Sequence, residues 1–281
     1  MTARKRAEGA EASGFALLIV LWTLLLLSLV VTHVIASGSA EARIAANLRA
    51  NAAAEALADG AVFEAIFRMV DSSGTPWTAD GTSHKLGYRD AAVSVRILPL
   101  AGKVNPNFAS LPLLSALLAA GGADEGEADA VARAIADWRG RDNRESPLAQ
   151  RQGPYRTAGF EVGPPGGPIE SLDELGHVLG MTPALLQAVK PYLSLYQMGP
   201  PDPALAAPVV AQALRHLPQS LPSPSAEAED TPPAKVETVS VEAVVTAADG
   251  ARFTRRAVIR VGPVFPRGYI VLAWGGAQDE A

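Results

Sequence analysis

The sequence predicts an α+β fold in which a long N-terminal helix packs on an antiparallel sheet, and a large all-helical domain is inserted between strands. Three observations lead to this prediction. An apolar run at residues 15–31 leads into a stretch, residues 37–70, that contains no proline. Alternating apolar and polar residues at 91–100 and again beyond 236 predict strands. Helical patterns fill most of residues 103–215. The apolar run also predicts a single transmembrane segment at the N-terminus.

Composition narrows the function classes. The chain has 281 residues, enough for one membrane anchor and one or two modest domains. Its net charge of −5 gives no broad basic excess, so bulk binding of nucleic acid is disfavoured. Cysteine is absent, which excludes disulfides, thiolate metal sites and thiol nucleophiles. The four histidines are far apart, and no phosphate loop or hydrolase motif is found, so we expect no enzymatic activity.

The N-terminus begins with a basic leader. Arg4, Lys5 and Arg6 precede the apolar run, which reaches the roughly 20 residues needed to cross a bilayer when residues 32–36 are added. The positive-inside rule places the leader in the cytoplasm and the rest of the chain beyond the membrane. Three interpretations are open: a secretory signal peptide cut near residues 36–38, an uncut signal anchor, or a prepilin leader.

The residues around the start of the apolar run favour the prepilin leader. Small residues and Gly14 are followed by Phe15, and the helix-forming apolar run then continues without a carboxylate. This pattern predicts a leader of residues 1–14 that is cleaved between Gly14 and Phe15. One helix over residues 15–70 would be about 84 Å long at 1.5 Å per residue.

The second half of this helix is predicted to be amphipathic and to pack on a domain. Apolar side chains recur there at roughly helical spacing, at Ile44, Leu48, Ala52, Leu57, Val62, Ile66 and Met69. The alternative is a membrane stalk followed by a separate helix, with a break at Gly38 or Gly60. Residues 71–90 are rich in Ser, Gly, Thr and Asp, and are predicted to form a loop before the strand at 91–100.

The helical insert contains an internal repeat. "SLPLLSALL" from Ser110 and "SLDELGHVL" from Ser171 share one pattern, and a degraded third copy lies at residues 207–214. Ser171 and Glu174 form a capping-box pattern that starts a helix. Thr182 and Pro183 start the next helix, and residues 127–139 form another.

Paired short helices of this kind resemble helix-hairpin-helix modules, which can bind DNA through backbone N–H groups. The first copy, however, ends in the acidic stretch "AAGGADEGEAD", which would repel phosphate. We therefore expect a packing module, and nucleic acid is an unlikely partner.

The C-terminal part predicts a Pro-rich linker at residues 216–235 and strands at residues 236–281. Alternating residues on both sides of Asp249 and Gly250 indicate a hairpin, and "GYIVLAW" predicts a last strand. These strands would complete the sheet begun before the insert.

Residues 14–67 resemble type IV pilin-like proteins, and especially the minor pseudopilin K (GspK family) of type II secretion systems. Most pilin-like proteins carry a glutamate at the fifth residue after the cleavage point, where this chain has Ile19. K pseudopilins similarly lack that glutamate. "GKVNPNFASLPLLSALL" from Gly102 resembles a further element of K pseudopilins. The resemblance implies a pilin-like fold, with residues 15–36 as the transmembrane half of the helix and 37–102 as periplasmic helix and first strands.

The resemblance also implies the function. A prepilin peptidase would cut before Phe15, and family members are then N-methylated at that residue. The protein would sit at the tip of the type II secretion pseudopilus in the bacterial inner membrane, single-pass, with its N-terminus cytoplasmic and its bulk periplasmic. Expected partners are the minor pseudopilins I, J and H, the major pseudopilin G, the secretin and exported proteins. The alternatives are a membrane-anchored DNA-binding protein of the competence type and a type IV pilus minor pilin.

K pseudopilins have an acidic loop that binds calcium, and the corresponding segment here follows Asp137. Asp142, Asn143 and Glu145 could add oxygen ligands, which makes calcium the one expected cofactor candidate. Arg139, Arg141 and Arg144 lie in the same segment and oppose a cation. A solvated loop with surface ion pairs is the competing interpretation.

Overall fold

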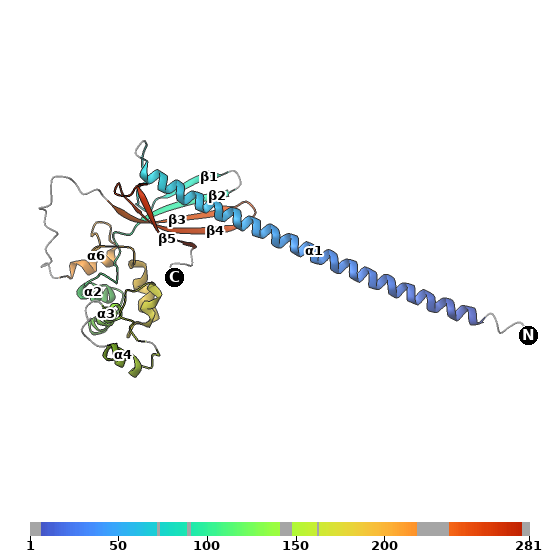
Figure 1. Ribbon diagram of the computed structural model, residues 1–281, viewed down its shortest axis with the longest axis horizontal. Coiled ribbons are helices and arrows are strands. Elements are labelled where there is room, and N and C mark those ends of the chain that lie inside the picture. The colour runs from blue at the N-terminus through green and yellow to red at the C-terminus, as the bar shows by residue number, and fades with distance from the viewer. Residues whose placement is uncertain are drawn as a thin grey trace, which may run out of the picture.

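The computed structural model describes residues 7–71, 74–88, 91–140, 148–161, 163–217 and 236–276. It shows the predicted α+β fold, with a long helix, a five-stranded sheet and a helical head (Figure 1). The long helix is α1 (Ala7–Val70), and the head comprises the helical elements between β2 and β3. The strands are β1 (Ser83–Tyr88), β2 (Ala91–Pro99), β3 (Glu237–Ala247), β4 (Arg252–Val261) and β5 (Tyr269–Gly276).

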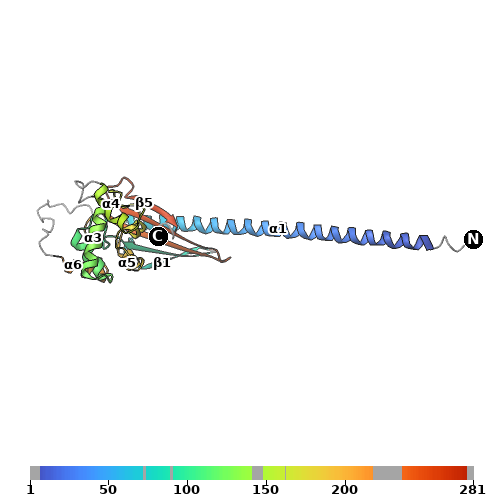
Figure 2. The same ribbon diagram turned by 90° about the horizontal axis from the view of Figure 1, so that it is seen from below.

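Helix α1 is continuous over 64 residues, about 96 Å at 1.5 Å per residue. Neither Gly38 nor Gly60 interrupts it, so the alternative of a stalk with a separate second helix is wrong. The helix begins far from the rest of the molecule and reaches the sheet only with its last turns (Figures 1 and 2). Good helix formers and the absence of proline explain this length.

The sheet is antiparallel throughout, with the strands in the order β1-β2-β3-β4-β5. Strands β2 and β3 pair directly, with Val95 opposite Ala243, although the whole helical head lies between them in the sequence. The hairpin at Asp249 is confirmed: Gly250 adopts a positive φ of 90°, and the Ala251 N–H donates to the Asp249 carboxylate at 3.0 Å.

The predicted loop at residues 71–90 was partly wrong, because β1 lies within it. This strand reads "SHKLGY" and forms one edge of the sheet, paired only with β2. The side chains of β1 are mostly exposed, so its sequence shows no alternation of apolar and polar residues. For this reason the strand could not be recognised from the sequence.

The membrane-distal turns of α1 cover one face of the sheet. The buried helix residues are small or β-branched, which lets the helix approach closely, and they pack on Val95, Ile97, Val241 and Ile259. They are Ala54, Ala58, Ala61, Val62, Ala65 and Ile66. Burial of this stripe, together with the strand residues, forms the first of two apolar cores.

The expectation that the whole second half of α1 packs on a domain was too broad. Ile44 and Leu48 are 60% and 64% exposed. The longest strand, β3, has 11 residues and spans about 36 Å, whereas residues 37–70 of the helix extend about 51 Å. The sheet is therefore too short to cover the helix before about residue 54.

Arg255 on β4 ties the helix to the sheet. Its guanidinium bonds Glu55 at 2.6 Å and Asp59 at 2.5 Å, both on α1, and lies over the rings of Phe253 and Trp274 at 5.0 and 5.6 Å. Burial alone would lower the pKa of Arg255, but the hydrogen bonds that it donates to Asp59 and Glu55, together with their negative charges, outweigh burial and raise that pKa.

The head contains a second core and lies at the membrane-distal end of the molecule (Figures 1 and 2). Its α-helices are α2 (Leu111–Ala120), α3 (Glu125–Arg139), α4 (Leu148–Thr157), α5 (Pro183–Val189) and α6 (Pro208–Arg215). Two short 3₁₀ helices, η1 (Leu172–His177) and η2 (Lys190–Tyr192), complete it.

The internal repeat has a structural basis. Ser110 and Ser171 cap α2 and η1 through their hydroxyls, and the equivalent leucines Leu114 and Leu175 are both buried. The capping box of Ser171 and Glu174 is present, as predicted. The second copy is a 3₁₀ helix instead of an α-helix and ends at His177.

Helix α4 was not predicted: it lies in the segment after Asp137, which was expected to be a loop. Its sequence contains Gly153 and Pro154, which usually mark loops. The helix is short, and the Pro154 carbonyl still accepts from the Ala158 N–H at 3.0 Å, so the proline is tolerated.

Candidate functional site

The first candidate region is the apolar start of α1. Phe15–His33 form a 19-residue segment with a mean hydropathy of 2.7 and no buried side chains, long and apolar enough to cross a membrane. Both of its threonine hydroxyls are satisfied within the helix: Thr23 donates to the Val20 carbonyl at 2.9 Å, and Thr32 to that of Ser28 at 2.8 Å. The segment therefore offers lipid a largely apolar surface on which the threonine hydroxyls are paired.

The residues predicted for cleavage lie in this helix. Gly14 and Phe15 fall in its early turns, after the helix start at Ala7. Ile19 is 47% exposed and presents an aliphatic side chain where most pilin-like proteins carry a carboxylate. Cleavage at Gly14 and methylation at Phe15 stay predictions.

The element that begins at Gly102 joins the head to the sheet. A Cβ on Gly102 would lie 2.2 Å from the backbone oxygen of Leu205, so only glycine fits there. Asn105 is 2% exposed and donates to the carbonyls of Leu195 and Gln197 at 2.8 and 2.7 Å. The resemblance to K pseudopilins drew attention to this element, and the structure shows that it is a connector.

Asn107 extends the connector. Its amide donates to the Ile169 carbonyl at 2.9 Å and accepts from the Ile169 N–H at 2.8 Å, in the manner of a paired strand. Residues 104 and 193 add a parallel bridge. These contacts link segments that are distant in sequence and hold the first residues of the insert to the rest of the head.

Of the predicted calcium ligands, only Asp137 lies in the described part of the chain, in the last turn of α3. Asp142, Asn143 and Glu145 lie outside the described residues. Within the described ranges, no group of three or more His, Asp or Glu side chains could hold a metal ion. The neighbouring Arg139 is buried and donates to the carbonyls of Pro106 and Ala109. Calcium binding by this segment stays a prediction, because three of its four expected ligands lie outside the described residues.

Tyr155 of α4 is buried in the core of the head, next to Trp138 of α3. Its ring is 6.0 Å from that of Trp138, and its hydroxyl accepts from the Leu179 N–H at 3.1 Å. Burial raises the pKa of Tyr155; the Leu179 hydrogen bond opposes the rise, and the negative charge of Asp137 adds to it. The tyrosine is therefore a neutral packing residue at physiological pH.

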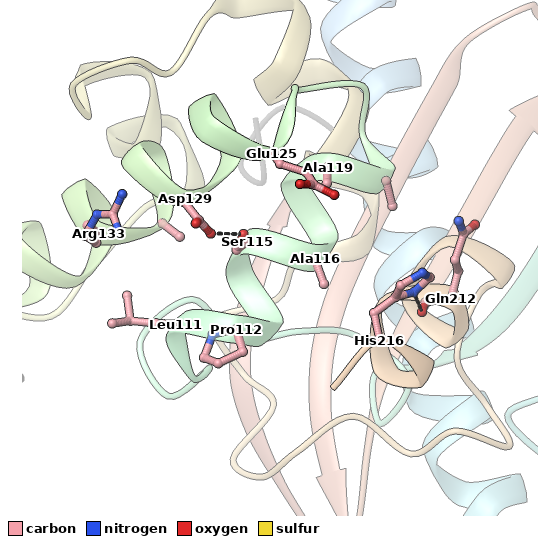
Figure 3. A pocket seen from close by; sticks show the side chains of 12 residues that line it. Leu111, Pro112, Ser115, Ala116, Ala119, Glu125, Asp129, Arg133, Gln212 and His216 are labelled. Carbon is pink, nitrogen blue, oxygen red and sulfur yellow. Dashed lines mark hydrogen bonds between the residues drawn. The ribbon is translucent and has the colours of Figure 1, made fainter. Parts of the chain in front are cut away.

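Two grooves open on the head. One, of about 580 Å³, lies between α2, α3 and α6 (Figure 3). Apolar side chains of α2 form its floor, and Ser115 donates to Asp129 across it at 2.5 Å. The other, of about 500 Å³, lies where the head meets β2, β3 and β4. Both grooves are lined by a mixture of polar and apolar side chains.

The helix-hairpin-helix interpretation gains no support from the geometry. Asp124 precedes α3 and caps it by accepting from the Glu127 N–H, and Glu125 and Glu127 lie in the first turn of that helix. A phosphate would meet negative charge there.

The sequence did not predict the ion pairs between Arg255 and helix α1, because the partners of Arg255 are about 200 residues away and no local pattern marks them.

Comparisons with known proteins agree with this architecture. Residues 97–198, which span the end of β2 and most of the head, match the family model of "Type II secretion system (T2SS), protein K". No curated protein matches the sequence.

A similar solved structure is a chain in the crystal structure of the GspK-GspI-GspJ complex from the enterotoxigenic Escherichia coli Type 2 Secretion System. The TM-score is 0.55 with 15% sequence identity, over 85% of this chain and 98% of that chain. This likeness shows the shared fold.

Proposed function

We propose that the chain is a minor pseudopilin of the protein K family of the type II secretion system, which occupies the tip of the secretion pseudopilus and starts its assembly. The observation that carries the tip position is the size and place of the helical head. The head lies at the end of the molecule farthest from the anchor and widens it beyond the sheet (Figure 1). A further subunit stacked above would meet this head, whereas the membrane-proximal side of α1 stays accessible.

The anchor supports the same position. A carboxylate inside a bilayer costs a few kcal/mol unless it is paired, and pilin-like subunits are thought to pair it with the N-terminal amine of a neighbour. A tip subunit has no subunit above it to recruit. Ile19 instead of glutamate is therefore compatible with the tip and with an anchor that leaves the membrane easily.

The partners in this proposal are other pseudopilins. The similar solved complex contains GspI and GspJ beside GspK, and we infer the equivalent I and J partners for this chain. The minor pseudopilin H, the major pseudopilin G, the prepilin peptidase, the secretin and exported proteins complete the expected set. The basic leader supports a cytoplasmic N-terminus and a periplasmic head in this proposal. The role is structural, with no catalytic step.

The test is co-purification. The tagged full-length chain is co-expressed with I and J pseudopilins of the same system and isolated from detergent-solubilised membranes. A stable ternary complex is expected. Recovery of the chain alone, while I and J associate with each other, would contradict the proposed position. A DNA gel shift at moderate salt tests the competence-type alternative, for which salt-dependent binding would be required.

A further inference from the structure

Helix α1 covers one face of the sheet and leaves the opposite face without a helix. Val95, Val241 and Ile259 lie under α1, and alternate residues of the same strands point away from it. On this helix-free face the described strands carry five cations and one carboxylate, at Lys85, Arg96, Arg252, Arg256, Arg260 and Glu242. We call it the basic face, because its charge is opposite to the −5 of the whole chain.

Contacts within the sheet do not neutralise the basic face. Glu242 lies between Arg96 and Arg256 in the strand register, and its Oε1 is 3.8 Å from Nη2 of Arg256. Lys85, Arg96 and Arg252 are exposed and have no ion-pair partner in the part of the chain that the structure describes. One carboxylate does not balance these cations, so a positive potential remains over the face.

The basic face continues into the groove of about 500 Å³ between the sheet and the head. Leu98 and Arg256 line this groove from the sheet, and the head adds Leu193, Lys103 and Glu170. The two head charges are of opposite sign, whereas the leucines give the groove an apolar wall. The groove therefore offers a seat for an apolar side chain at the membrane-distal end of a cationic surface.

Two other anionic partners fit this face poorly. Strands β3 and β4 run along α1 in Figure 1, so the basic face stands on edge to a bilayer that α1 crosses and does not lie flat on lipid headgroups. Single-stranded nucleic acid binds sheets through stacked aromatic side chains. The aromatic residues of the described strands lie instead on the face that α1 covers, at Tyr88, Phe253, Tyr269 and Trp274. An acidic protein surface meets neither objection.

We propose that the basic face is a docking surface for the acidic face of a neighbouring protein, which lies alongside α1 and places an apolar side chain in the groove. Opposite charges steer such an encounter, so its association rate falls as salt is added. This inference goes beyond the proposed function and does not depend on the tip position, because it uses only the fold and the membrane anchor.

The experiment measures binding of a fluorescein-labelled oligoglutamate peptide to the full-length chain in non-ionic detergent, by fluorescence anisotropy at low ionic strength. Arg96→Glu combined with Arg252→Glu should weaken binding about tenfold, since reversing each exposed charge is expected to cost roughly threefold. The matched control combines Arg133→Glu with Arg215→Glu, which changes two exposed arginines of the head by the same charge. It should bind within about twofold of wild type.

Equal losses in the two double variants would assign the binding to bulk charge and overturn the proposal, as would a wild-type chain that does not bind the peptide. Tighter binding of an oligothymidylate of equal charge, lost in the Arg96→Glu and Arg252→Glu variant, would overturn it in favour of nucleic acid. A low-salt dimer in analytical ultracentrifugation that the same variant abolishes would overturn it in favour of a second copy of the chain. The Tm of each variant is the folding control, and if the reversals lower it, Arg96→Gln with Arg252→Gln replaces them, with an expected loss of about threefold.

Discussion

Replacing Arg255 with methionine should weaken the docking of α1 on the sheet by about 2–3 kcal/mol. The side chain is only 8% exposed, and it makes charge-assisted hydrogen bonds to Glu55 and Asp59. Bonds of this type contribute about 1.5–3 kcal/mol each when buried. The carboxylates of Glu55 and Asp59 are 50% and 35% exposed, so water partly replaces the lost hydrogen bonds in the variant. Each bond is therefore expected to contribute only roughly half of that buried value.

A further few tenths of a kcal/mol come from the uncompensated carboxylates, which lie four residues apart on one helix and repel each other. Methionine keeps an unbranched stem over Phe253 and Trp274, so the apolar packing is largely retained. The loss therefore reports the ion pairs and not a cavity.

The assay is urea unfolding of the full-length chain in detergent, followed by tryptophan fluorescence, with Trp274 beside the altered residue. Arg68→Met is the matched control, because its pair with Glu64 is exposed on the same helix and should contribute less than about 0.5 kcal/mol. Equal, small effects of the two variants would refute the idea that Arg255 clamps the helix.

Other predictions concern the head. Gly102→Ala should destabilise it by about 3 kcal/mol, because the new Cβ would strike the Leu205 carbonyl; thermal unfolding checks this, and an unchanged Tm would contradict it. Asn105→Ala should cost about 2–4 kcal/mol, since two backbone carbonyls lose a buried donor, and should increase proteolysis at the junction between head and sheet. The raised pKa of Tyr155 means that its neutral form is favoured in the folded state, so stability is present below about pH 10 and falls as pH rises above it. Tyr155→Phe should flatten this alkaline loss in a pH series of unfolding curves, whereas a loss of the same size in the variant would assign it to other groups.

Local patterns predicted much of the fold. The Asp249 turn, the Ser171 capping box and the Thr182 cap are all decided by neighbouring residues, and each appears in the structure. The pairing of β2 with β3 could be expected only because both edges of the insert carried strand signals. The extent of α1 that is covered was overestimated, because periodicity shows a helical face but not how long the opposing sheet is.

The features that the sequence did not predict have a common physical cause: they depend on contacts between residues that are distant in the sequence. In the sequence Arg255 resembles any charged residue of an exposed strand, and only the fold brings Glu55 and Asp59 next to it. The glycine and proline of residues 148–157 indicate a loop, yet this stretch forms helix α4, because Tyr155 is buried in the core of the head. The strand β1 depends on its partner β2 and has no apolar pattern of its own.

The central claim is that α1 begins as a pilin-type anchor, and the mass of the N-terminal peptide tests it most directly. The chain is isolated from membranes of cells with and without a prepilin peptidase, and its N-terminal peptide is weighed intact. We predict a mature end at Phe15, carrying one methyl group, only when the peptidase is present. An intact leader in both strains, or a cut near residue 36, would contradict the account and leave an anchored or secreted protein with a helical head.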